Sequence, residues 1–122
     1  MALGRLSSVS LDCSDPATLA RFWADVLGGE IGYDSESFVA VRTDRGWLGA
    51  VRVDNYRAPT WNDDATPKQI HLDLQVDDLD QAQEEMVRLG ARVVDDQPSP
   101  DLWRVLLDPA GHPFCLWTQT LG

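Results

Sequence analysis

Two stretches of the chain share one order of hydrophobic and polar positions. The segment SLDCSDPATLARFWADVLGGEIGYD contains an alternating stretch, an acidic residue, an apolar helical period, a glycine and a further alternating stretch. The segment HLDLQVDDLDQAQEEMVRLGARVVDD has the same order. Three residues recur at matching places: Leu27, Gly28 and Asp34 return as Leu89, Gly90 and Asp96. The repetition indicates a unit of strand, helix and strand that the chain uses twice.

Each copy contains one helix with its own start and stop signals. In the first copy Asp15 can accept hydrogen bonds from the free amides of the helix start, and Gly28 suits a left-handed stop. In the second copy Asp77 or Asp78 can cap the helix that ends before Gly90. Apolar residues at helical spacing follow each cap and are expected in the core: Leu19, Phe22, Trp23, Val26 and Leu27, then Leu79, Ala82, Met86 and Leu89.

Strand candidates follow each helix: Glu30–Asp34, Phe38–Thr43 and Trp47–Asp54 in the first half, then Arg92–Asp95, Leu102–Asp108 and Pro113–Thr118 in the second. A strand from Gln69 that contains His71 opens the second half. Each half therefore has the order βαβββ, which predicts an α+β fold. Because 122 residues suffice for one compact domain and not for two independent cores, we predict a single domain over residues 1–122. Its parts are module one at 5–54, a link at 55–68 and module two at 69–119.

Composition excludes several classes of partner. The formal net charge is −10, and the basic residues are scattered singly, which argues against nucleic acid as a partner. No stretch approaches the roughly 20 consecutive apolar residues of a membrane span. The first residues lack the pattern of an export signal, so we expect a cytoplasmic protein with Cys13 and Cys115 as free thiols.

Five motifs spread over the whole chain carry a resemblance to a known family. They are SLDCSDPATLARFWADVLGG, YRAPTW, PKQIHLDLQVDDLD, RLGARVV and LLDPAGHPFCLW. Together they resemble the vicinal oxygen chelate superfamily, which has the glyoxalase and bleomycin-resistance fold, and within it the bacterial glyoxalase-like proteins. The resemblance implies a cup-shaped, eight-stranded mixed sheet built from two tandem βαβββ modules, with helices outside and a small-molecule ligand inside. It also implies a homodimer.

The metal site of the superfamily is largely missing from this sequence. Metal-dependent members place a histidine near the head of the first strand, a ligand on the fourth, a histidine heading the fifth and a glutamate on the eighth. His71 matches the third of these positions. Ser8 or Ser10, depending on the alignment, stands at the first position, and Cys115 stands at the last. We therefore expect no cofactor, with His71 as the candidate ligand if a divalent metal does bind.

Candidate ligand contacts lie on the polar faces of the expected strands. Side chains alternate along a strand, so His71 and Asp73 share one face while the apolar residues between them turn to the helix. The residues expected to contact a ligand are Asp12, Arg52, Trp61, Trp103, Cys115 and Trp117, with Leu102 as the alternative to Trp103. Indole rings give flat apolar contacts. The acidic residues suit a cationic or amphipathic ligand.

Three functions are compatible with these residues. The first, which we favour, is binding of a small organic molecule at a degenerate metal site. The second is a metal-free enzyme in which His71 acts as general base, oriented by Asp73 or by an acid of the first strand. The third is a metal-dependent lyase, isomerase or dioxygenase with His71 as a metal ligand. A salt bridge or hydrogen bond that joins Asp12 or Asp73 to a partner such as Arg52 is the structural alternative for these two acids.

Overall fold

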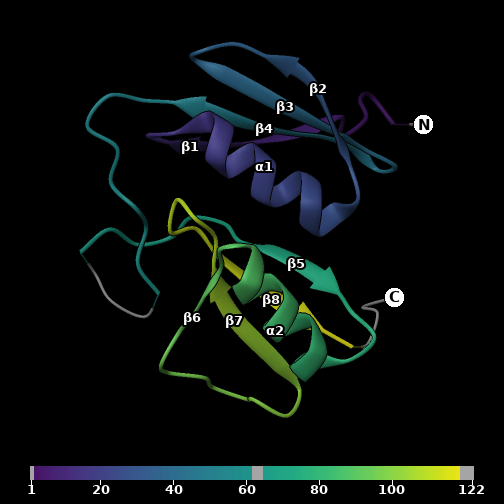
Figure 1. The fold of residues 1–122 in the computed structure, drawn as a ribbon, viewed down its shortest axis with the longest axis vertical. Helices are drawn as coiled ribbons and strands as arrows, with labels where there is room; N and C mark the ends of the chain where they lie inside the picture. The colour runs from purple at the N-terminus through teal and green to yellow at the C-terminus, as the bar shows by residue number, and fades with distance from the viewer. Residues whose placement is uncertain (1, 62–64, 119–122) are drawn as a thin grey trace. The chain divides into compact units, whose positions relative to one another are not determined.

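The computed structural model describes residues 2–61 and 65–118, and it divides the chain into two compact units (Figure 1). The first unit is Met1–Tyr56 and the second is Arg57–Gly122. Each unit contains one helix and one four-stranded sheet in the order βαβββ. The predicted α+β fold with two βαβββ modules is therefore confirmed.

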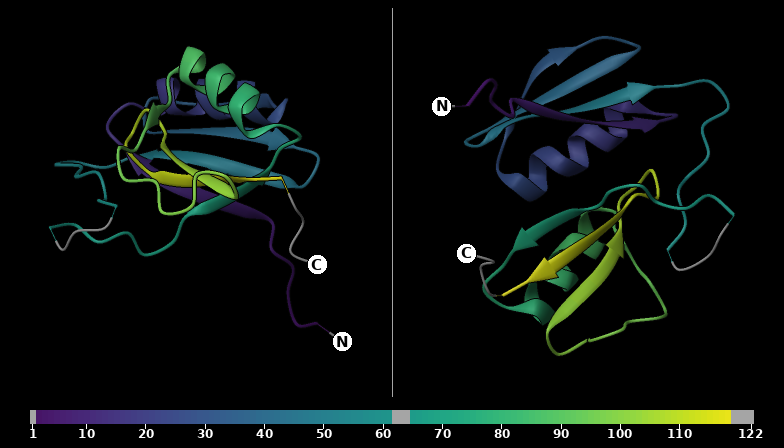
Figure 2. Two further views of the ribbon diagram at one scale, coloured as in Figure 1. Left: turned by 90° about the horizontal axis from the view of Figure 1, so that it is seen from below. Right: turned by 180° about the vertical axis from the view of Figure 1, so that it is seen from behind.

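The first unit is a mixed sheet with a helix on one face. Its elements are β1 (Ser8–Cys13), α1 (Pro16–Leu27), β2 (Glu30–Asp34), β3 (Phe38–Thr43) and β4 (Gly46–Arg52). The strand order is β1-β4-β3-β2, and β1 runs parallel to β4 while the other pairs are antiparallel. Helix α1 packs on β3 and β4 (Figure 2). The core of this unit consists of Leu11, Cys13, Leu19, Phe22, Trp23, Val39, Val41, Leu48 and Ala50.

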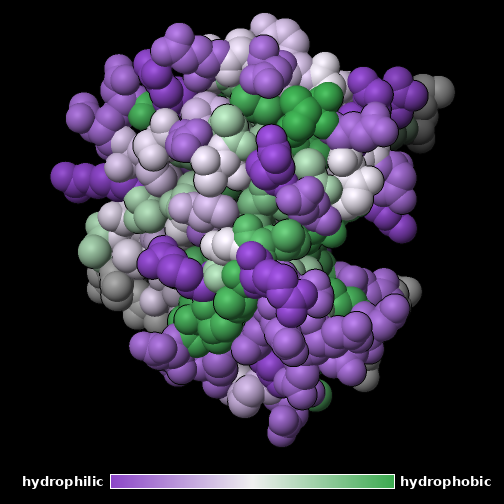
Figure 3. All heavy atoms as spheres, viewed as in Figure 1, coloured by the Kyte–Doolittle hydropathy of each residue, from purple (hydrophilic) through white to green (hydrophobic). Residues whose placement is uncertain are grey.

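The second unit repeats this topology. Its elements are β5 (Leu72–Gln75), α2 (Leu79–Leu89), β6 (Arg92–Val93), β7 (Trp103–Leu107) and β8 (Pro113–Trp117). The strand order is β5-β8-β7-β6, with β5 parallel to β8. Hydrophilic side chains cover the region over α2 (Figure 3), where Arg88 forms ion pairs with Glu84 and Glu85. No helix of the described residues is long and apolar enough to cross a membrane.

The helices begin at the predicted acidic caps. The Asp15 carboxylate accepts hydrogen bonds from the backbone amide and the hydroxyl of Thr18, at 3.2 and 2.7 Å. In the second unit Asp78, and not Asp77, is the cap, because its carboxylate accepts from the amide of Gln81 at 2.9 Å. Both acids satisfy amides that the first helical turn leaves without partners.

Three expectations about the second unit were wrong in detail. Strand β5 begins at Leu72, so His71 lies in the segment just before it. Leu89 was expected in the core but is exposed at the end of α2. Strand β6 ends at Val93: the amide of Val94 still donates to the carbonyl of Val105 at 3.3 Å, and beyond it the side-chain amide of Gln97 pairs with β7 in place of the backbone. It donates to the carbonyl of Val105 at 2.7 Å and accepts from its amide at 2.9 Å.

The second sheet presents two different faces. Arg104 and Leu106 on β7 turn toward the helix, since the Arg104 guanidinium donates to Gln83 and Asp80 of α2 at 2.9 and 2.8 Å and Leu106 is fully buried. Side chains alternate along a strand. Trp103 and Val105 therefore lie on the opposite face, together with the residues that pair with them on β8.

The turn before β8 depends on one buried carboxylate. Asp108 is fully buried, and its Oδ1 accepts from the backbone amides of Ala110 and His112, both at 2.9 Å. Gly111 in the same turn has a φ of 88°, which L side chains rarely adopt. This turn sets the register of β8 against β7, and His112 lies in it.

We expect Asp108→Ala to lower the free energy of unfolding by about 2 to 3 kcal/mol, because it leaves two partly buried amides without a charged acceptor. Urea denaturation would measure the change. Asp101→Ala is the matched control: Asp101 is exposed, and its loss should cost no more than about 0.5 kcal/mol. Equal stabilities of the two variants would contradict the structural role of Asp108.

Candidate functional site

An imidazole and a carboxylate pair at the start of β5. His71 Nδ1 lies 3.2 Å from Asp73 Oδ1, and both side chains are about one-third exposed, at 32% and 38%. The two residues are separated by Leu72, whose side chain points to the other face of the sheet. The predicted contact between His71 and Asp73 is therefore present in the structure. The roles assigned to these residues stay predictions.

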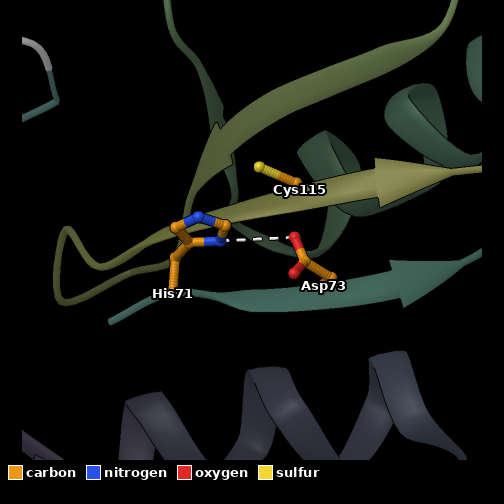
Figure 4. Close-up of side chains that lie close together, drawn as sticks. All are labelled: His71, Asp73 and Cys115. Atoms are coloured by element: carbon orange, nitrogen blue, oxygen red, sulfur yellow. Dashed lines mark ion pairs between the residues drawn. The ribbon is translucent and has the colours of Figure 1, made fainter. Parts of the chain in front are cut away.

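Cys115 joins this pair from a distant part of the sequence. Asp73 on β5 and Cys115 on β8 are direct neighbours in the parallel register. One donor atom each from His71, Asp73 and Cys115 lies within 4.8 Å of the others (Figure 4). Burial raises the pKa of the Cys115 thiol to about 12, and the charge of Asp73 and a hydrogen bond to its carboxylate act in the same direction. The thiol is therefore protonated at neutral pH in the metal-free protein.

Tryptophans surround the three donor side chains. Trp117 Nε1 donates to Asp73 Oδ1 at 3.2 Å, so the carboxylate has a second partner besides His71. Trp103 stacks on Trp117 with ring centroids 5.3 Å apart and an interplanar angle of 18°. Trp61 lies edge-on to both Trp103 and His71, at 6.4 and 6.1 Å. Three tryptophans predicted from the sequence thus form one connected aromatic group in the second unit.

Trp61 has two features that bear on binding. The Lys68 ammonium lies over its ring, 4.1 Å from the centroid, which is a cation–π contact. The Trp61 Nε1 hydrogen is buried and has no hydrogen-bond partner among the residues that the structure describes. A ligand atom that accepts a hydrogen bond would remove the cost of that unsatisfied donor.

The two remaining candidates, Asp12 and Arg52, belong to the first unit. Asp12 is exposed on β1 and lies on the face of its sheet opposite α1. Arg52 alternates with Val51, so it lies on the helix side, where it forms an ion pair with Glu36 at 3.4 Å. It lines an open pocket of about 640 Å³ at the start of α1, together with Ser14, Asp15, Pro16, Ala17, Asp34, Ser35 and Glu36. The ligand-binding roles of Asp12 and Arg52 stay predictions.

Comparison with known proteins identifies the family. The model of a family described as glyoxalase-like domain matches residues 8–117. The chain therefore belongs to this family, within the vicinal oxygen chelate superfamily that the sequence motifs indicate. No curated relative matches the chain.

Solved structures with this fold include fosfomycin resistance proteins. The FosX protein from Mesorhizobium loti is 20% identical, with a TM-score of 0.71 over 99% of this chain and 95% of that one. An E126Q mutant of FosX from Listeria monocytogenes, in complex with Mn(II) and 1S,2S-dihydroxypropylphosphonic acid, is 22% identical with a TM-score of 0.71, over 99% and 94% of the two chains. A glyoxalase/bleomycin resistance protein/dioxygenase family enzyme from Burkholderia phytofirmans PsJN is 17% identical with a TM-score of 0.69, over 93% and 97%. At these identities the likeness establishes the fold.

The donor atoms of this site fit a divalent cation that accepts a thiolate ligand. His71, Asp73 and Cys115 would hold it through nitrogen, oxygen and sulfur. This set suits a cation that accepts thiolate, whereas Mn²⁺ prefers oxygen donors. A cation bound there would supply positive charge to polarise an oxygen of a ligand. The sequence predicts Asp73 as an orienting acid or a salt-bridge partner, and Cys115 as a ligand contact at the position of the lost glutamate. It does not predict that the two are neighbours, which follows from the pairing of the first and last strands of the module.

The raised pKa of Cys115 predicts how stability depends on pH. Above about pH 9 the thiol of the unfolded chain loses its proton, whereas the folded protein keeps it up to about pH 12, so the free energy of unfolding falls as the pH rises through this window. By pH 10.5 the metal-free protein should have lost about 2 kcal/mol more than Cys115→Ser, at roughly 1.4 kcal/mol per pH unit. Urea denaturation in EDTA at pH 8 and pH 10.5 gives the loss of unfolding free energy for the wild type and for Cys115→Ser. Equal losses in these two proteins would contradict the raised pKa of Cys115.

Proposed function

We propose that this protein binds a small, flat organic molecule with cationic or amphipathic character on the aromatic face of the second sheet. The observation that carries the proposal is the connected group of Trp61, Trp103 and Trp117 beside the His71–Asp73 pair. Small-molecule sites typically combine aromatic walls with a few polar groups that converge on the ligand. This face combines both kinds of group within one unit.

The charge of the ligand follows from the contacts of Trp61 and from the net charge. Lys68 already places an ammonium over the Trp61 ring, so the ring is oriented to accept a cation. The chain has a formal net charge of −10, which raises the local concentration of cations and favours their association. A cationic ligand would take the position of the Lys68 ammonium. The Trp61 Nε1 hydrogen, which has no acceptor among residues 2–61 and 65–118, supports a ligand that also contains an acceptor.

A second candidate function is proton transfer by His71. Its support is the 3.2 Å separation of His71 Nδ1 from Asp73 Oδ1, since a carboxylate at one ring nitrogen orients the imidazole and leaves the other nitrogen for a substrate. The fosfomycin resistance proteins of the same fold make fosfomycin a suitable first test compound. We favour binding because Cys115, with its thiol protonated at neutral pH, stands where metal-dependent relatives have a glutamate.

The binding proposal predicts a preference for a flat cation. N-methylquinolinium should bind about fivefold to tenfold more tightly than uncharged quinoline at pH 7.5, because a cation–π contact contributes roughly 1 kcal/mol. Titrations followed by the NMR signals of the indole NH groups would measure both affinities. Trp103→Leu should weaken N-methylquinolinium binding about tenfold. Leu102→Ala is the control and should leave binding unchanged, since Leu102 is 63% exposed and precedes β7.

The same samples separate binding from catalysis. His71→Asn should change the affinity for N-methylquinolinium by less than about threefold, because the aromatic contacts supply most of the binding. Fosfomycin incubated with the protein, with and without Mn²⁺, should remain unchanged in its NMR spectrum. Product that forms with the wild type and disappears with His71→Asn would replace the binding proposal with the enzymatic one.

We also propose that the protein functions as a homodimer in the cytoplasm. Neither Cys13 nor Cys115 forms a disulfide, which is the state that the reducing cytoplasm maintains. Strand β2 is at the edge of its sheet, and all five of its residues are exposed, Ile31 and Tyr33 among them. Such an edge offers backbone groups and apolar surface to a second copy of the chain.

Light scattering should give twice the mass of one chain for the wild type. Ile31→Lys should shift the mass toward that of one chain, because it places a charge on the exposed edge. Val87→Lys changes a residue of similar exposure on α2 and should leave the mass unchanged. A wild type with the mass of one chain would rule out the dimer.

A further inference from the structure

His71 and Cys115 stand at two ligand positions of the superfamily's metal site, but the donor atoms on the second sheet differ from that site in composition. All three come from residues 71–115 of one unit, and one of them is sulfur. From this geometry we infer that His71, Asp73 and Cys115 form a zinc-selective site. The inference does not depend on the proposed binding of an organic molecule.

The distances between the donors are close to what a tetrahedral ion requires. Zinc bonds of about 2.0 to 2.1 Å to nitrogen and oxygen and about 2.3 Å to sulfur put neighbouring donors roughly 3.3 to 3.6 Å apart. His71 Nδ1 and Asp73 Oδ1 are 3.2 Å apart, and the whole set lies within 4.8 Å. Binding therefore requires the sulfur to approach by at most about 1.2 Å. Three protein donors leave one tetrahedral position for water or a ligand atom.

The structure holds two of the three donors in place before any ion binds. Cys115 is buried on β8, which lies between β5 and β7 in the sheet. Asp73 is its neighbour on β5, and the Trp117 indole fixes its carboxylate with a hydrogen bond of 3.2 Å. Hydrogen bonds from residues that do not themselves bind the metal orient the metal ligands and reduce the entropy lost on binding. His71, just outside the strand, is the donor with freedom to adjust.

Sulfur determines which ion the site selects. A thiolate prefers zinc to the harder Mn²⁺, and zinc is also the stronger binder of the two in the general affinity order of divalent metals. On binding, the Cys115 thiol passes its proton to the solvent, and the thiolate takes the coordination position. The charge of Lys68 acts on Cys115 and opposes a cation, so its removal should tighten binding.

Cobalt substitution and calorimetry test the inference directly. Tag-free protein is stripped with EDTA, dialysed and titrated with ZnCl₂, MnCl₂ and CoCl₂. We expect one zinc per chain, bound at least about 100-fold more tightly than Mn²⁺. Bound Co²⁺ should show a near-ultraviolet sulfur-to-metal charge-transfer band. Lys68→Met should tighten zinc binding severalfold.

Four variants assign the donors. Cys115→Ser should abolish the charge-transfer band, whereas Cys13→Ser, which changes the buried thiol of the first unit, should retain it. His71→Ala and Asp73→Asn should each weaken zinc binding about tenfold to 100-fold. Because His71 and Asp73 are partly exposed, their variants should fold even if Cys115→Ser does not. The inference fails if the wild type binds less than one zinc, lacks the band, or loses it with Cys13→Ser.

Discussion

The parallel pairing of β5 with β8 is the constraint on which the candidate site depends. The first strand of the module is joined to the last through a helix and two further strands, so residues far apart in the chain become neighbours across one ladder. Asp73 lies beside Cys115 and Gln75 lies beside Trp117 in that register. A shift of one residue would turn the Asp73 side chain to the helix side. The buried Asp108 in the turn between β7 and β8 holds β8 against its other neighbour, β7.

The carboxylate of Asp73 is the centre of the polar contacts. His71, Trp117 and the Cys115 thiol all interact with it. Burial and, after it, the negative charge of Asp73 raise the pKa of the thiol, which stabilises the neutral form of Cys115 in the absence of a cation. The same charge attracts a cation, and a bound cation reverses the effect on the thiol. Asp73 therefore contacts both the aromatic group and the other two donor side chains.

The two modules share a topology and differ in the chemistry of the face opposite the helix. When the helix caps Asp15 and Asp78 are taken as equivalent, the pair in the first unit that corresponds to Asp73 and Cys115 is Ser10 and Gly49, which offers one hydroxyl in place of a carboxylate and a thiol. The first unit lacks a counterpart of the Trp103 and Trp117 stack at the paired positions on β3 and β4, where Phe38 pairs with Val51. Both units therefore have the same backbone topology, and they differ in the side chains on the face opposite the helix.

The sequence by itself determined the local structure of this protein. Helical spacing, the acid caps at Asp15 and Asp78 and the glycine stops act over a few residues, so the pattern alone predicts both helices and the βαβββ order. It also determined that His71 and Asp73 share a face, because strand alternation is local. The exact length of β6 could not be predicted, since the side chain of Gln97 replaces backbone pairing there. Only the tertiary structure placed Cys115 and the tryptophans around Asp73, because strand pairing joins residues more than 40 positions apart and depends on the packing of the whole module.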